Sequence, residues 1–145
     1  MKMGKNHSGA RTSAALSSER GQSLVEFALV VPLLLLLIIG IAELGRAWMT
    51  QNILTGAARE AVRVLAVPDP PGGVSAATTR ANQILTSAGI TTATLSMTGV
   101  PAAAAFGEVT VTVSYDFPVV IAGFIPGLNN AVFPLSSTTT MRREY

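Results

Sequence analysis

The sequence contains no cysteine, a single histidine (His7) and no lysine beyond Lys5. The absence of cysteine excludes disulfide bonds and thiolate metal sites, and it carries no information about the compartment. Histidine, lysine and cysteine are the commonest general bases and nucleophiles of enzymes. Because residues 22–145 lack all three and show no cluster with metal-ligand spacing, we expect no catalytic site, no metal and no cofactor. The sequence therefore predicts a protein that is not an enzyme.

Charged residues are also scarce, at 12% of the 145 residues, and they are unevenly distributed. The net charge of +2 arises because the first 21 residues hold four basic residues and one acid, whereas the remainder is slightly acidic. The downstream arginines are scattered and are not interleaved with aromatic side chains, so nucleic acid is not an expected partner. Positive charge in front of an apolar run instead predicts that this end of the chain lies in the cytoplasm.

An uncharged apolar run extends from Phe27 to Ala42, where Leu, Ile, Val and Ala dominate. Its sixteen residues would form a helix of about 24 Å, which is shorter than the roughly 30 Å hydrocarbon core of a bilayer. Apolar neighbours extend the run to about residues 24–45, and Arg46 can reach from there to the membrane interface. The run therefore predicts a single membrane-spanning segment with lipid as a partner.

The helical pattern continues beyond the apolar run. Four apolar residues recur at spacings of 4, 3 and 4, which places them on one helix face: Leu54, Ala58, Ala61 and Leu65. Two acid–base pairs are spaced three apart on the same stretch: Glu43 with Arg46, and Glu60 with Arg63. Pro32 would kink a helix here or remove one of its hydrogen bonds. We expect one helix from Ser23 to Val67, apolar all round in its first half and amphipathic in its second.

Residues 68–145 predict a small head of different composition. Prolines and glycines over residues 68–73 end the long helix. A short second helix is expected over residues 75–88, stopping at Gly89, with this apolar face: Ala77, Ala81, Ile84, Leu85 and Ala88. Alternation of apolar and polar residues then predicts three strands, at residues 93–98, Glu108–Phe117 and Phe133–Arg143. The predicted fold class is α+β, in which the amphipathic half of the long helix packs against a small antiparallel sheet with one short extra helix.

The link between Pro118 and Pro134 is apolar but interrupted by glycine, proline and asparagine, so it is too broken to cross a membrane. Two interpretations stay open. The link is either a loop tucked over the sheet or an exposed apolar patch that meets a neighbouring subunit.

Gly21 and Glu26 lie five residues apart, where the basic leader meets the apolar run. Residues 1–20 have the composition of a disordered leader. A carboxylate costs about 2–3 kcal/mol at the centre of a membrane segment, so such a group usually has a partner of opposite charge. Cutting the chain after Gly21 would create one, because Gln22 would then carry a new α-amino group. Between staggered subunits of a filament, this amine could neutralise Glu26 of a neighbour and set the stagger.

The segment resembles the signal of type IV pilin precursors: a basic leader, Gly21 at the cut, Glu26 five residues on, and then Phe27. A longer stretch resembles the TadE-like family in particular. The segments that carry this likeness are Gly21–Pro32, Gly40–Arg46, Ala57–Arg63 and Thr138–Glu144. The likeness is specific over residues 21–66, weaker over the strands and absent over residues 67–107. Leu44 departs from the family, in which an aromatic residue is frequent at this place.

The resemblance implies a structural minor pilin or pseudopilin of a Tad (tight adherence) pilus. It implies a leader of residues 1–21 that a prepilin peptidase removes, a retained helical region of residues 22–67 and a head of residues 68–145 outside the cytoplasm. The partners would be other pilins or pseudopilins of the same filament and an assembly platform in the bacterial inner membrane. The residues singled out are Gly21 and Gln22 at the cleavage site, Glu26 and Phe27 in assembly, and Pro32 and Gly40 in the membrane helix.

Two other readings predict a different N-terminus. Gly40-Ile41-Ala42 has the small-x-small pattern of a signal-peptidase site, so a secreted domain would begin at Glu43. An uncut, single-pass anchor with an external scaffold or binding domain would keep the whole leader. Both differ from a pilin precursor, whose mature chain would begin at Gln22.

Overall fold

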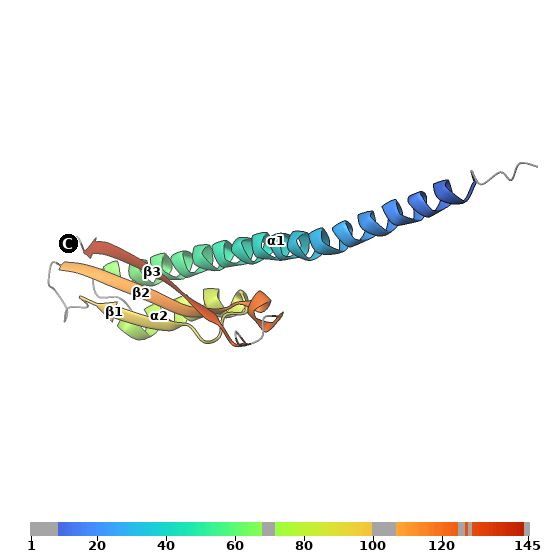
Figure 1. Cartoon of the computed structure of the whole chain (residues 1–145). Helices are drawn as coiled ribbons and strands as arrows, with labels where there is room; N and C mark the ends of the chain where they lie inside the picture. Colours follow the sequence, from blue (N-terminus) through green and yellow to red (C-terminus); the bar gives the residue numbers. More distant parts are fainter. Residues whose placement is uncertain (1–8, 68–71, 100–106, 125–126, 128, 144–145) are drawn as a thin grey trace, which may run out of the picture. The chain divides into compact units, whose positions relative to one another are not determined.

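The computed structural model describes residues 9–67, 72–99, 107–124, 127 and 129–143, and the side chains of residues 9–20 lie outside this description. The elements, in chain order, are α1 (Gly9–Ala66), α2 (Gly73–Ser87), β1 (Thr94–Thr98), β2 (Gly107–Pro118), the 3-10 helix η1 (Val120–Phe124) and β3 (Val132–Arg143) (Figure 1). The chain divides into two compact units, Met1–Ile41 and Ala42–Tyr145, and α1 contributes to both. The predicted α+β fold class is confirmed by the long apolar helix, the short second helix and the three-stranded antiparallel sheet.

Helix α1 begins earlier than the composition predicted. Residues 9–20 are helical, so the expectation of a disordered leader is wrong for them, while residues 1–8 lie outside the described part. This stretch contains no proline, and its alanines, serines and arginines allow a helix that is already formed downstream to extend through it. Pro32 lies inside α1 and the helix continues across it, although the missing N–H leaves the carbonyl of Ala28 without its helical donor.

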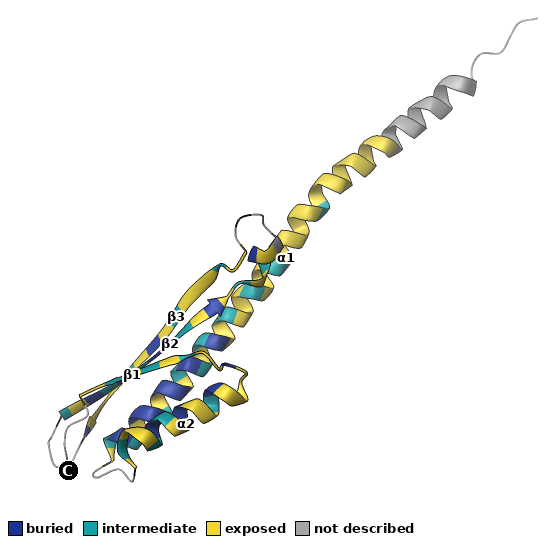
Figure 2. Cartoon of the chain, turned by 90° about the horizontal axis from the view of Figure 1, so that it is seen from below, coloured by how far each residue is buried: buried dark blue, intermediate teal, exposed yellow. Residues whose placement is uncertain are grey.

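The core of the Ala42–Tyr145 unit lies where α1 and α2 pack on the same face of the sheet (Figures 1 and 2). The four α1 residues that the spacing predicted are at most 1% exposed, as are two further residues of this helix: Leu54, Ala57, Ala58, Ala61, Val62 and Leu65. Helix α2 adds Ala77, Ala81 and Leu85, and β2 adds Val109, Val111 and Val113. The alanines let the two helices approach closely, while leucines and valines supply most of the buried apolar volume.

Helix α2 ends in a hydrogen-bonded glycine turn. Gly89 has a φ of 77°, its N–H donates to the carbonyl of Thr86, and the N–H of Ile90 donates to the carbonyl of Leu85 at 2.8 Å. These two bonds satisfy carbonyls that the helix end leaves open. The turn also returns Ile90 to the core. Ala88, which we predicted to lie on the apolar face, is exposed because the helix has ended before it.

The sheet has the strand order β1-β2-β3, and its register aligns hydroxyl residues on the outer face. Three cross-strand rows result: Thr94–Ser114–Ser136, Ser96–Thr112–Thr138 and Thr98–Thr110–Thr140. The hydroxyl oxygens of Thr110 and Thr140 are 2.8 Å apart, and those of Thr112 and Thr138 are 2.9 Å apart. Cross-strand pairs of this kind stabilise a sheet by roughly 0.2–1 kcal/mol each. The polar half of the predicted alternation therefore forms an outer face of hydroxyl rows, which the exposed charged residues Glu108, Asp116 and Arg142 flank.

The free edge of β3 is tied to α1 by side chains. The amide of Gln51 donates to the carbonyl of Ser136 at 2.7 Å, and the hydroxyls of Thr55 and Ser137 are 2.9 Å apart. Farther along, Arg143 donates to the carbonyl of Val67 at 3.2 Å. Such contacts occupy part of an edge that would otherwise offer unpaired backbone groups to other chains.

Glu60 pairs with α2 and not with Arg63, which corrects our prediction of a pair within α1. Its carboxylate lies 3.2 Å from Nε of Arg80, and the Arg63 side chain is exposed. The local spacing predicted one partner, but the packing of α2 beside α1 supplies another. With Arg80 53% exposed, the pair contributes little to stability.

Candidate functional site

The residues that the sequence analysis singled out all lie on the part of α1 between Gly21 and Gly40. The side chains of Gln22, Glu26 and Phe27 are exposed, and a Cβ atom added at Gly21 would meet nothing within 4 Å. Consecutive turns of one helix carry these residues, so they form a linear segment and not a pocket. A segment of this kind is suited to recognition along its length.

Glu26 is a carboxylate among exposed apolar side chains. Its neighbours Val25 and Phe27 are 62% and 67% exposed. Among the side chains that the structure describes, none forms an ion pair with Glu26. Gln22 lies four residues earlier, about one helical turn away along the axis. Glu26 therefore presents a carboxylate at the start of an apolar surface, and no ion pair within the described side chains neutralises it.

The apolar run is exposed along its length except at Val31 and Ile39, which are half-buried. Its large exposed side chains include Leu29, Val30, Leu33, Leu34, Leu35, Leu36, Leu37, Ile38 and Ile41. Within the described residues, one helix is long and apolar enough to cross a membrane, and 0% of its most hydrophobic window is buried by the protein. Residues 21–41 would extend about 32 Å as a helix, close to the roughly 30 Å hydrocarbon core. The segment fits a single-pass membrane anchor.

Pro32 and Gly40 are both exposed within this run. A Cβ atom at Gly40 would meet nothing within 4 Å, so no contact inside the chain requires a glycine there. Both residues thus lie on the surface that lipid or other helices would cover.

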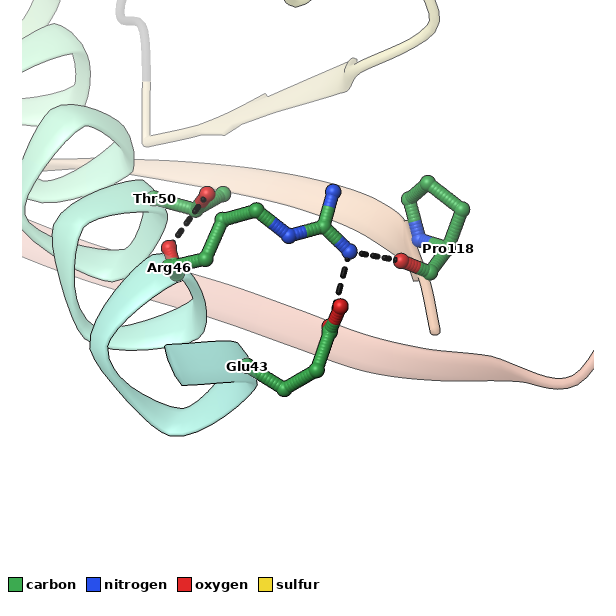
Figure 3. Close-up of polar contacts among 4 residues, drawn as sticks. All are labelled: Glu43, Arg46, Thr50 and Pro118. Atoms are coloured by element: carbon green, nitrogen blue, oxygen red, sulfur yellow. Dashed lines mark hydrogen bonds and ion pairs between the residues drawn. The ribbon is translucent and has the colours of Figure 1, made fainter. Parts of the chain in front are cut away.

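Arg46 joins α1 to the end of β2 (Figure 3). Its guanidinium lies 2.8 Å from the carboxylate of Glu43, donates to the backbone carbonyl of Pro118 and sits 4.3 Å from the centre of the Phe117 ring. Thr50 donates to the backbone carbonyl of Arg46 at 3.0 Å. The sequence predicted the Glu43–Arg46 pair from its spacing, but it did not indicate the contacts with β2. We call these residues, Glu43, Arg46, Phe117 and Pro118, the Arg46 cluster.

Replacing Arg46 by Ala is expected to lower the free energy of unfolding of the Ala42–Tyr145 unit by about 1–2 kcal/mol, because a charged hydrogen bond and a cation–π contact are lost together. Urea unfolding of the detergent-solubilised chain, followed by circular dichroism, measures the change. The matched control is Glu43→Gln, which removes only a partly exposed ion pair and is expected to cost no more than about 0.5 kcal/mol. Equal effects of the two substitutions would contradict the role given to the contacts with β2.

The Pro118–Pro134 link divides between the two interpretations left open by the sequence. Ala122 of η1 is 3% exposed and packs inward. Val120, Val132 and Phe133 are instead 55%, 54% and 60% exposed. Within the link, Ala122 is therefore buried against the rest of the unit, whereas Val120, Val132 and Phe133 are exposed to solvent.

Comparison with known families identifies the segment that carries these features. Residues 21–63 match the model of the family described as TadE-like protein. No curated protein and no solved structure matches the chain. The match begins at Gly21 and ends among the buried residues of α1, which run from Leu54 to Leu65. It therefore includes Glu26, the apolar run and Arg46. The resemblance to TadE-like proteins is confirmed for this segment.

Proposed function

We propose that this chain, whose residues 21–63 carry the TadE-like pattern, is the precursor of a structural pilin or pseudopilin of a Tad pilus. In this proposal a prepilin peptidase cuts between Gly21 and Gln22, and the mature subunit is held in the bacterial inner membrane by the apolar part of α1. The Ala42–Tyr145 unit lies outside the cytoplasm. The subunit then joins a filament with other pilins or pseudopilins through the same apolar surface, with the help of an inner-membrane assembly platform.

The observation that carries this proposal is an exposed apolar helix that starts with a carboxylate, Glu26, for which the described side chains provide no ion-pair partner. A bare surface of this kind needs a cover from outside the chain, either lipid or the apolar helices of other subunits. A cut after Gly21 would create an α-amino group on Gln22, and its positive charge is opposite to that of the Glu26 carboxylate. A neighbouring subunit can supply this amine, so the pairing would favour one stagger between subunits over others.

The basic leader and the assembly segment would have separate roles. Lys2, Lys5, Arg11 and Arg20 favour retention of the leader on the cytoplasmic side before cleavage. Phe27, next to Glu26 and 67% exposed, would be covered by lipid before assembly and by partner helices in the filament. Partner helices could then cover both the ring and the carboxylate.

The proposal is tested by the N-terminus of the mature protein. Expressed with a prepilin peptidase, the chain is expected to begin at Gln22, as measured by intact mass and N-terminal peptide mapping. Gly21→Val should block the cut, because a branched side chain replaces hydrogen at the scissile bond. Gly40→Val is the matched control, since a Cβ at either glycine meets nothing within 4 Å and neither change disturbs the fold.

Other N-termini would contradict the proposal in distinguishable ways. A mature chain beginning at Glu43 would indicate a secreted domain released from a signal peptide. An uncut chain in the membrane, with Gly21→Val identical to the unmodified protein, would indicate a permanent anchor.

A further inference from the structure

A cavity of about 260 Å³ lies within the Ala42–Tyr145 unit, between α1, the turn after α2 and the end of β2. In the sheet register β1 begins at Thr94, opposite Ser114, so β1 does not extend beside Tyr115 and Phe117 farther along β2. Helix α2 has also ended, at Ser87. The inner side of the sheet is therefore incompletely covered at this end of the unit.

The lining of the cavity is apolar with a few polar groups. Ile53 and Phe117 contribute apolar walls, Arg46 contributes a guanidinium, and Thr50 and Tyr115 contribute one hydroxyl each. Sites for small molecules are usually larger, at roughly 300–1,000 Å³, so a cavity of this size fits a single large side chain better than a free ligand. An aromatic side chain with one polar atom would match both the walls and the polar groups.

Trp48 lies on the opposite side of the same helix. The cavity residues of α1 are Arg46, Met49, Thr50 and Ile53. Because successive helical residues are about 100° apart, these residues are centred roughly 150° around the axis from Trp48. They also bracket Trp48 in sequence, so the indole ring and the cavity are at the same height along α1. Trp48 is 72% exposed, more than any other large apolar side chain that the structure describes in this unit.

A side chain that projects from one side of a unit cannot fill a cavity on the other side of the same unit. Between two copies, however, this geometry permits a heterologous contact, which is the kind that repeats into rings or open filaments. Moving one copy sideways, without turning it over, brings its Trp48 to the cavity of the next copy. The α1 segments of successive units would then run in the same direction, as subunits of one filament require.

We propose that Trp48 of one copy inserts into the cavity of the next copy and thereby joins their Ala42–Tyr145 units. Arg46 supports a ring as the occupant: its guanidinium covers Phe117 at 4.3 Å, yet 42% of the side chain is exposed and available to a second ring. The hydroxyls of Thr50 and Tyr115 can accept the indole N–H. Tryptophans inserted into pockets are typical of the side chains that dominate interface energies. This contact rests on the assembly in the proposed function and names a second copy as the partner.

The absence of cysteine allows a directional test on the full chain. One copy carries Asn52→Cys, an exposed position one helical turn from Trp48, and the other carries Ala88→Cys, an exposed position in the cavity lining. The two copies bear different tags, are reconstituted together in liposomes of phosphatidylethanolamine and phosphatidylglycerol, and are treated with a short bis-maleimide. The mixed pair is expected to cross-link. Two Asn52→Cys copies, or two Ala88→Cys copies, should not, because the like positions lie on opposite sides of the contact.

Trp48→Ala supplies a matched control, because its effect should depend on which copy carries it. In the Asn52→Cys copy it removes the inserted ring and should lower the cross-linked yield at least about tenfold. In the Ala88→Cys copy it leaves the cavity intact and should not lower the yield. Trp48→Phe in the Asn52→Cys copy should retain part of the yield, since a ring still enters the cavity.

The outcomes separate this contact from the proposed function. Cross-linking of like pairs would show that the Trp48 faces of two copies meet each other and would overturn the heterologous contact. A yield that Trp48→Ala lowers in neither copy would reject the ring as the occupant. Absence of the mixed cross-link in a protein whose mature chain begins at Gln22 would overturn the contact alone. A directional cross-link in a chain that is not cut after Gly21 would reject pilin processing and keep the contact.

Discussion

Replacing Glu26 by Ala is expected to leave cleavage and membrane insertion intact while reducing incorporation of the subunit into filaments by more than about 100-fold. In the proposed filament, Glu26 meets the amine of Gln22 from a neighbour among apolar helices. Removing one member of a buried ion pair leaves the other uncompensated, at a cost of about 3–5 kcal/mol. Because the structure gives Glu26 no ion-pair partner among the described side chains, the loss should fall on assembly and not on folding.

The ratio of subunit in sheared filaments to subunit in membranes measures this effect. Glu26→Gln keeps the size of the side chain without its charge and should behave like Glu26→Ala, whereas Glu26→Asp keeps the charge and should retain part of the incorporation. Glu108→Ala, an exposed carboxylate on β2, controls for loss of a negative charge as such. Normal incorporation of Glu26→Gln would show that the charge has no part in assembly.

The elements of the fold were predictable wherever periodicity is local. The spacing of Leu54 and Leu65 with the alanines between them identified the buried face of α1, and the alternation along β2 identified the apolar face of the sheet. Contacts between elements were not predictable, because many sequences with the same periodicity pack differently. Arg46 reaches a carbonyl 72 residues away, and Glu60 finds Arg80 on α2 in place of the closer Arg63.

The candidate site differs from the fold, because its residues could be located from the sequence but its proposed partner could not. Gly21, Glu26 and the apolar run are adjacent in sequence, so their spacing predicted both the segment and its likeness to the TadE-like family. Their proposed partner belongs to another molecule, and nothing in one chain can position it. The Pro118–Pro134 link was not predictable for a different reason, because its apolar composition was compatible with either burial or exposure, and the structure buries Ala122 while it leaves Val120 and Phe133 exposed.

Replacing Leu54 by Ala is expected to lower the free energy of unfolding of the Ala42–Tyr145 unit by about 3 kcal/mol. Leu54 is 0% exposed and is among the largest fully buried side chains, so its truncation removes apolar contacts and leaves a cavity in the core. A domain of this size has a total stability of roughly 5–15 kcal/mol, which makes the loss a large fraction of it. The midpoint of thermal unfolding should fall by roughly 10–20 °C in detergent, as followed by circular dichroism.

Leu44→Ala is the matched control, because it makes the same chemical change on the same helix. Leu44 is 71% exposed, so its truncation in detergent should alter the free energy of unfolding by less than about 0.5 kcal/mol. If the two variants lowered the free energy of unfolding by similar amounts, the helix face that carries Leu54 would not be the face of α1 that packs against the sheet. A loss confined to Leu54→Ala, with the mature chain still beginning at Gln22, would instead show that stability of the head and processing of the leader are determined by separate parts of α1.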